Sequence, residues 1–125
     1  MSNIDFDALN NNLNELKQTG TINKHIGNAM PKKYMQIKTI SKHAMEQGIQ
    51  RGIHADEMAE VAQTYVNNAI IMLEQSKGTK YLFLSLDGSA VIVEDNGMLI
   101  TIMPSDYYDP AMHSIIGEVQ KCLMS

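Results

Sequence analysis

Three short apolar segments separated by tight-turn sequences constrain the fold of this chain more than any other feature. Residues 81–86 read Tyr-Leu-Phe-Leu-Ser-Leu, residues 90–94 read Ala-Val-Ile-Val-Glu, and residues 98–103 read Met-Leu-Ile-Thr-Ile-Met. Asp87-Gly88 and Asn96-Gly97 lie between them, and such pairs supply the positive φ that tight hairpins need. The pattern predicts a three-stranded antiparallel meander. Because the strands are apolar at nearly every position, both sheet faces should be covered in part.

Helical periodicity flanks the meander on both sides. Apolar residues recur at helical spacing over residues 4–17, and a second stripe predicts a long helix from His54 to about Gln75. Residues 21–33 contain two helix breakers and are expected to form a loop. Asp109-Pro110 has the residue types of an N-cap and first helical position, which predicts a C-terminal helix.

A fourth strand and a short helix are predicted between the loop and the long helix. Residues 34–40 alternate apolar and polar side chains, and Ser41 can cap a helix that ends near Gln50. The order predicts an α+β fold, with N-terminal helices packed on an antiparallel sheet (the meander plus one earlier strand) and a C-terminal helix. We expect one domain over residues 1–125, with an N-terminal helical extension at 1–33, a core at 34–104 and the C-terminal helix at 105–125.

Cysteine usage and hydropathy narrow the class of protein. Cys122 is the only cysteine, so neither an intramolecular disulfide nor a cysteine-based zinc site can form, and its place on an apolar helical stripe predicts a buried structural thiol. The apolar runs are far shorter than a membrane span, and the first residues do not resemble a signal peptide. We therefore expect no membrane partner and a site of action in a cytoplasm, reached either directly or after secretion and delivery into a target cell.

Charge is unevenly distributed along the chain. The formal net charge is −4. Residues 17–53 nevertheless carry seven basic side chains against Glu46 alone, a sum of +6, whereas residues 54–125 carry three lysines against ten acids, a sum of −7. The basic segment could focus a polyanion locally. It could equally be a solvated lysine-rich face that serves solubility.

The basic segment ends in residues 41–53, where a histidine and an arginine lie eight positions apart. At 3.6 residues per turn this spacing places His43 and Arg51 on nearly the same helix face. The stretch Ser41-Lys42-His43-Ala44, the later Arg51-Gly52-Ile53 and the segment Leu99-Ile100-Thr101-Ile102 resemble motifs of small ribonuclease toxins of the barnase/EndoU/colicin/RelE-type superfamily. The resemblance covers about residues 34–104.

This resemblance implies metal-independent cleavage of RNA, with tRNA or rRNA as substrate. It further implies a role in bacterial competition, often as the C-terminal part of a larger toxin, and a cognate immunity protein or antitoxin as partner. At the family positions His43, Arg51 and Thr101 would be catalytic. Lys38, Ser41 and Lys42 would bind substrate.

The chemistry of such a site requires three kinds of group. A base must take the proton of the 2′-hydroxyl, an acid must protonate the leaving 5′-oxygen, and a cation must stabilise the phosphate in between. His43 can act as base or acid, Arg51 can donate a forked pair of hydrogen bonds to the phosphate, and Thr101 can donate one more. The second proton-transfer group is left open among His25, Glu46, His54, Tyr81 and His113. No metal-binding His-x-x-x-His or His-x-x-Glu-His spacing occurs, so neither metal nor cofactor is expected.

Structural roles compete with these assignments. A histidine on a short helix commonly caps or packs, Arg51 could pair with Glu46 or Asp56, and Thr101 suits a strand in any protein. A second hypothesis is a small acidic interaction protein (an immunity protein, antitoxin or adaptor), in which residues 106–109, Asp-Tyr-Tyr-Asp, mimic a phosphate backbone. A third is a dimerising sensor built on an exposed sheet edge. The nuclease hypothesis requires His43, Arg51 and Thr101 to meet at one cleft.

Overall fold

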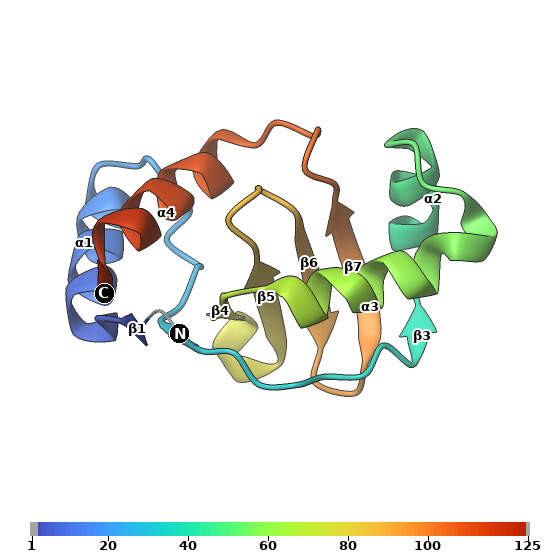
Figure 1. The fold of residues 1–125 in the computed structure, drawn as a ribbon, viewed down its shortest axis with the longest axis horizontal. Coiled ribbons are helices and arrows are strands. Elements are labelled where there is room, and N and C mark those ends of the chain that lie inside the picture. The colour runs from blue at the N-terminus through green and yellow to red at the C-terminus, as the bar shows by residue number, and fades with distance from the viewer. Residues whose placement is uncertain (1–2, 125) are drawn as a thin grey trace.

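A six-stranded sheet forms the centre of the fold (Figure 1). The structure is a computed structural model that describes residues 3–124. The strands lie in the order β2-β4-β5-β6-β7-β3, and all neighbours are antiparallel except β3 and β7, which are parallel. The predicted α+β class is confirmed. The strands are β2 (Ala29–Pro31), β3 (Thr39–Ile40), β4 (Ile71–Gln75), β5 (Lys80–Leu84), β6 (Ala90–Glu94) and β7 (Met98–Met103).

The predicted meander is β5-β6-β7, and its turns have the expected backbone. Gly88 and Gly97 adopt φ values of +92° and +91°, which glycine takes without steric cost. The β6–β7 register shifts between two successive pairs, from Ile92 opposite Thr101 to Val93 opposite Leu99, so a bulge lies in β7. A bulge changes which residues share a face. It leaves Thr101 opposite Ile92, on the sheet face that carries the cluster of α1 and α4.

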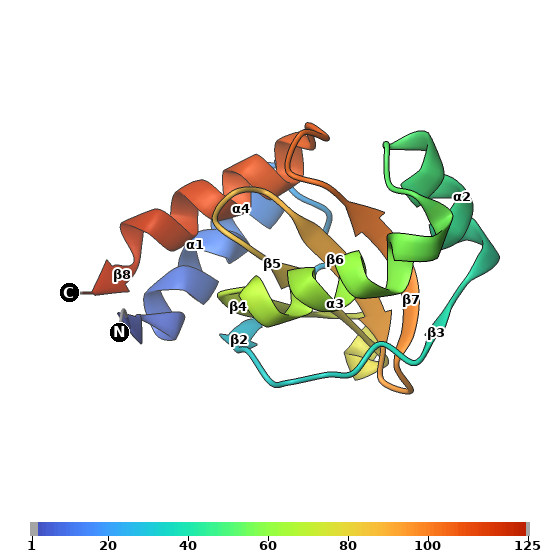
Figure 2. The same ribbon diagram turned by 45° about the vertical axis from the view of Figure 1, so that its right-hand side comes forward.

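Helices cover the two faces of this sheet unequally (Figure 2). Helix α3 crosses one face, where its buried side chains join Phe83, Val91 and Ile102 in one apolar cluster. Helices α1 and α4 pack together at the other face, where Leu13 and Ile115 join a second cluster with strand residues. The predicted burial of both faces is confirmed. The helices are α1 (Phe6–Gln18), α2 (Lys42–Gln50), α3 (Met58–Asn68) and α4 (Pro110–Lys121), with 3-10 turns η1 (Ala55–Glu57) and η2 (Ser76–Gly78).

The N-terminal helix shares its core with the sheet. Its buried residues Leu9 and Leu13 lie in the same cluster as strand residues of β4 and β5. A two-stranded sheet between β1 (Asn3–Ile4) and β8 (Leu123–Met124) joins the two ends of the described chain. No helix within residues 3–124 is long and apolar enough to cross a membrane.

The predicted long helix is wrong beyond Asn68, because residues 71–75 form strand β4. Met72 faces the α3 cluster, whereas Ile71 and Leu73 face the α1 and α4 cluster. A strand buried on both faces is apolar at successive positions, and such a run also fits a helical stripe. Periodicity alone therefore could not separate β4 from α3.

The strand predicted at residues 34–40 is also largely wrong. Only Thr39–Ile40 is a strand, and β2 lies earlier, inside the predicted loop. The alternation of apolar and polar residues over 34–40 has a different physical origin. Met35 and Ile37 pack against the α3 cluster, and the Gln63 side chain of α3 accepts a hydrogen bond from the Ile37 N–H at 2.8 Å and donates one to the Met35 carbonyl at 3.0 Å. A helix side chain satisfies this backbone in place of a neighbouring strand.

Replacing Leu13 by alanine should show that α1 is part of the core. Leu13 is 0% exposed, so its truncation is expected to lower the free energy of unfolding by about 2–5 kcal/mol. Urea denaturation of Leu13→Ala is the measurement, and Asn11→Ala, an exposed site on the same helix, is the matched control. An unfolding free energy equal to that of the parent would contradict an integral α1.

Cys122 should react slowly while the protein is folded. Burial raises the pKa of its thiol, the Asp5 and Glu118 carboxylates raise the pKa further, and Lys121 opposes them. The reactive thiolate is thereby disfavoured. Alkylation by iodoacetamide, followed by mass spectrometry, is expected to be much slower in buffer than in urea. The thiol of the unfolded chain ionises at a lower pH than the thiol of the folded chain. The contribution of Cys122 to the free energy of unfolding is therefore fully present below the ordinary thiol pKa and is lost as the pH rises through the raised pKa of the folded state.

Candidate functional site

The edge of β7 is completed by side chains of α2. Strand β3 pairs with β7 only as far as Leu99, whose carbonyl accepts a hydrogen bond from the Ser41 N–H at 3.0 Å. Beyond that point the Ile102 N–H donates to Gln47 Oε1 at 2.9 Å, and Arg51 Nη1 donates to the Ile102 carbonyl at 2.7 Å. Gln47 and Arg51 lie four positions apart, one helical turn. Together they replace the neighbouring strand that β7 lacks there.

The guanidinium group of Arg51 is held from a second side. It lies over the ring of Tyr107, 3.6 Å from the ring centroid, in a cation–π contact. The predicted pairing with Glu46 or Asp56 is absent: within residues 3–124 the only ion pair joins Lys121 to Glu118. Within residues 3–124, the Arg51 guanidinium makes no hydrogen bond other than the one to the Ile102 carbonyl. Arg51 is thus a fixed cation with donors left over for a ligand.

Arg51 and Thr101 line the same cleft, which has a volume of about 370 Å³. Its floor includes the strand residues Leu82 and Ile92, which lie on the sheet face where α1 and α4 pack. Its walls come from α2, the segment 23–26 and the segment 107–112. The polar side chains lining it are those of Asn23, His25, Gln47, Arg51, Gln75, Thr101, Tyr107 and Asp109. The Asp109 carboxylate is already engaged, because Oδ1 accepts a hydrogen bond from the Met112 N–H at 3.1 Å as the cap of α4.

His25 enters the cleft on a turn that is tied down at both ends. Ile22 and Ile26 are buried on either side of it, with 3% and 6% exposure. The His25 N–H donates to Asn23 Oδ1 at 2.8 Å, and the Gly27 N–H donates to the Glu74 carbonyl at 2.8 Å. A Cβ at Gly27 would lie 3.0 Å from that carbonyl oxygen, so glycine permits this close approach. These contacts anchor the backbone that carries the exposed His25 side chain beside the sheet.

His43 lies next to the cleft but does not line it. Its exposed ring is one turn before Gln47, and His43 Nε2 is 3.4 Å from Gln47 Nε2. Ser41 caps α2, accepting a hydrogen bond from the Ala44 N–H at 3.0 Å, as predicted. Lys38 and Lys42 are exposed and are not among the lining residues. The expectation that His43, Arg51 and Thr101 meet at one cleft is therefore met for Arg51 and Thr101 but not for His43, which lies beside the lining residue Gln47.

The other candidates for proton transfer lie elsewhere. The Tyr81 ring packs in the α3 cluster beneath Lys33, on the opposite sheet face. His54 precedes η1 and makes no side-chain cap, Glu46 is exposed on α2, and the His113 ring stacks on Tyr108 with centroids 4.6 Å apart. Within residues 3–124 no three His, Cys, Asp or Glu side chains gather where they could hold a metal ion.

Sequence patterns alone do not single out Gln47 or His25 for this cleft, and they group Tyr107 with acidic neighbours. Gln47 had a usable signal, since it lies four positions before Arg51 and shares its helix face. Tyr107 was grouped with neighbouring acids as a phosphate mimic, whereas it is the ring beneath Arg51. His25 was one of several candidates, and nothing in a loop without periodicity indicates that it reaches the sheet.

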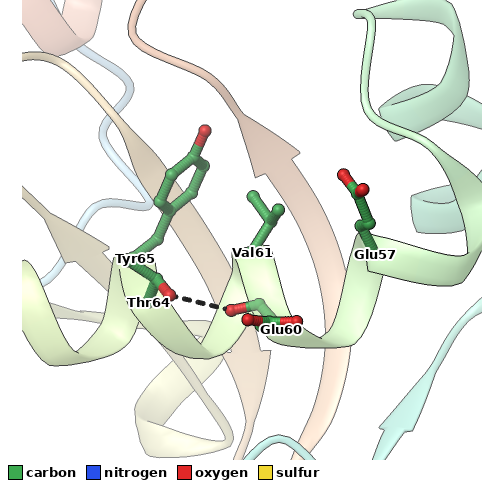
Figure 3. A pocket seen from close by; sticks show the side chains of 5 residues that line it. All are labelled: Glu57, Glu60, Val61, Thr64 and Tyr65. Carbon is green, nitrogen blue, oxygen red and sulfur yellow. Dashed lines mark hydrogen bonds between the residues drawn. The ribbon is translucent and has the colours of Figure 1, made fainter.

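A second depression lies along one flank of α3 (Figure 3). Glu57, Val61 and Tyr65 project from the same side of the helix, with Glu60 and Thr64 beside them. Burial raises the pKa of the Tyr65 hydroxyl, and the carboxylates of Asp87 and Asp106 raise it further. The lining contains two carboxylates and no lysine or arginine, so this surface would repel a phosphate chain.

Replacing Gln47 by alanine should show how much the stability of the β7 edge depends on α2. The substitution leaves the Ile102 N–H without its acceptor, so a cost of about 1–3 kcal/mol in unfolding free energy is expected. Gln47→Glu keeps an acceptor oxygen and should cost less. Urea denaturation measures the unfolding free energy of both variants. Hydrogen exchange of the Ile102 amide should be faster in Gln47→Ala but not in Gln47→Glu, which would place the destabilisation at this amide. Equal exchange in the two variants would contradict it.

None of the family models, curated proteins or solved structures compared with the chain matches it. The likeness to ribonuclease toxins therefore rests on the three short motifs around His43, Arg51 and Thr101. Function is accordingly inferred from the side chains of the cleft.

Proposed function

We propose that the chain is a metal-independent endoribonuclease domain of the toxin type, which cleaves tRNA or rRNA in a cytoplasm at the cleft of Arg51 and Thr101. The observation that carries the proposal is the composition of this cleft. An arginine that forms no ion pair within residues 3–124 and a threonine fifty positions away line one concave surface together with an exposed histidine, His25. Cation, hydroxyl donor and titratable ring are the groups that phosphodiester cleavage requires.

The reaction needs no group from outside the chain and the RNA. The 2′-oxygen forms a bond to phosphorus while its proton passes to one histidine. The bond from phosphorus to the 5′-oxygen breaks, and that oxygen takes a proton from a second histidine. The products are a 2′,3′-cyclic phosphate and a 5′-hydroxyl, and no atom changes its oxidation state. Histidine suits both steps because it gains and loses a proton near neutral pH.

His25 and His43 are the proposed pair of proton-transfer groups. His25 lines the cleft from the 23–26 turn, and His43 lies at its α2 edge beside Gln47. Groups on two sides of a bound phosphodiester can serve the attacking and the leaving oxygen in the same step. Arg51 stabilises the charge on the phosphate with its remaining N–H groups, and Thr101 donates a hydrogen bond to a phosphate oxygen.

A small acidic interaction protein is the second candidate. The observation that favours it is the acidic depression on α3, whose lining includes Glu57, Glu60 and Tyr65 (Figure 3). Carboxylates next to an aromatic ring suit a basic protein partner, as an immunity protein or antitoxin would require. This candidate leaves the cleft of Arg51 and Thr101 without a role.

The nuclease proposal predicts cleavage of purified tRNA or rRNA in the presence of EDTA. His25→Gln and His43→Gln should each lower the rate by about 10²–10⁴-fold, because each removes one proton-transfer group. His54→Gln is the matched control, since it removes an exposed imidazole outside the cleft. Denaturing gels of end-labelled RNA measure the rates, and a 2′,3′-cyclic phosphate at the new end identifies the chemistry.

Three results would contradict parts of the proposal. Loss of cleavage in EDTA would overturn metal independence. A fully active His43→Gln variant would remove His43 from the mechanism, and a fully active His25→Gln would do the same for His25. Absence of cleavage by the parent protein, with tight binding to a basic toxin that Glu57→Gln/Glu60→Gln weakens, would favour the interaction protein.

A further inference from the structure

We propose that the cleft continues into a lysine-lined groove that binds the phosphate chain of a single-stranded RNA beyond the scissile phosphate. The inference rests on the proposed function for the reaction but adds a binding site on the N-terminal segment and η2. Nothing in the ribonuclease-like motifs, which begin at Ser41, includes these residues. The groove is defined here by Lys17, Lys24 and Lys77.

The groove adjoins the cleft through shared residues. His25, Ile26 and Gln75 line both hollows. The cleft is also lined by Arg51 and Thr101, and the other hollow is also lined by Lys17, Lys24 and Lys77. The two hollows therefore form one surface path, with His25 at the junction. A chain bound at Arg51 would pass His25 before it reached the lysines.

The three lysines are free to meet an anion. They come from separate parts of the chain, the last turn of α1, the 23–26 turn and η2. None of their ammonium groups forms an ion pair within residues 3–124, and Glu74 is the only acid lining the groove. A further hollow lined by Lys17 and Lys24 extends the same surface along α1. Cations grouped without partners are expected to raise the local concentration of a polyanion.

Two other lysines of the basic segment make contacts elsewhere. Lys32 donates to the Asn67 carbonyl at the end of α3, and Lys33 lies over the Tyr81 ring, 5.8 Å from its centroid. Both contacts are on the α3 face of the sheet, away from the cleft. The fold thus divides the basic segment between two faces, and only part of it lies beside Arg51.

The substrate class follows from the shape of this path. A hollow that is continuous with an active cleft, lined by exposed ammonium groups and floored by partly apolar sheet, suits a flexible strand more than a rigid duplex. Lysine contacts to phosphate carry no base specificity, so the groove contributes affinity and register while the cleft performs the chemistry. A single-stranded loop or end of a folded RNA fits this description.

Charge removal in matched sets tests the groove. Lys17→Gln/Lys24→Gln/Lys77→Gln is compared with Lys32→Gln/Lys33→Gln/Lys121→Gln, which removes the same charge outside the groove. Both are assayed on an unstructured oligoribonucleotide and on a ribo-dinucleoside monophosphate, which holds only the scissile phosphate. The groove variant should lose about 10- to 100-fold in kcat/KM on the oligonucleotide, mainly through KM, and should keep its activity on the dinucleotide.

Binding is measured separately with a 2′-O-methyl oligonucleotide, which cannot be cleaved through its 2′-position. The slope of log K against log salt should fall by about 2 in the groove variant, because three phosphate contacts are lost, and should stay unchanged in the control. Equal losses in the two variants, or equal losses on both substrates, would overturn the groove. If the parent cleaves neither substrate, the proposed function fails, and the binding slopes alone then decide for or against the groove.

Discussion

The backbone of Ile102 carries the contact on which the arrangement of the site depends. An edge strand exposes N–H and C=O groups that another chain can pair with, and proteins commonly cover or block such edges. Here β3 covers β7 only at its start, and the Gln47 and Arg51 side chains complete the rest. These two bonds fix the distance between α2 and the sheet. They consequently bring Arg51 to the face that carries Thr101, fifty positions away in the chain.

The same contact gives Arg51 two roles that a single substitution cannot separate. Its guanidinium supports β7 through Ile102 and packs on Tyr107, so removing it disturbs the cleft wall as well as its charge. Five N–H donors on one planar group make this double use possible, since one bond to a carbonyl leaves others unused. A lysine could not both fill the edge and present a forked pair of donors. Substitutions at His25 and His43 therefore separate a chemical role from a structural one more clearly, because neither side chain supports the sheet as Arg51 does.

Local signals predicted much of the fold and little of the site. The Asp-Gly and Asn-Gly turns fixed β5, β6 and β7, and Ser41 and Asp109 marked two helix starts, because each acts within a few residues. Strand β4 was hidden because burial on both faces removes the alternation of a strand. Arg51 and Thr101 were found through short motifs. His25 could not be found that way, because its position depends on the bond from Gly27 to Glu74, a contact between distant segments.

The unequal covering of the sheet also explains how an acidic chain can present a surface for a polyanion. Net charge describes the whole molecule, whereas a ligand responds to the field of the face that it approaches. The turn η1 and helix α3 place Glu57 and Glu60 over one face of the sheet, and the cleft with Arg51 lies on the other. At physiological ionic strength the field of exposed charges decays over about 8 Å, so the two faces are largely screened from each other. In the proposed function, a phosphate chain therefore responds to the lysines and the arginine of the face that it approaches, and little to the acids on the other face.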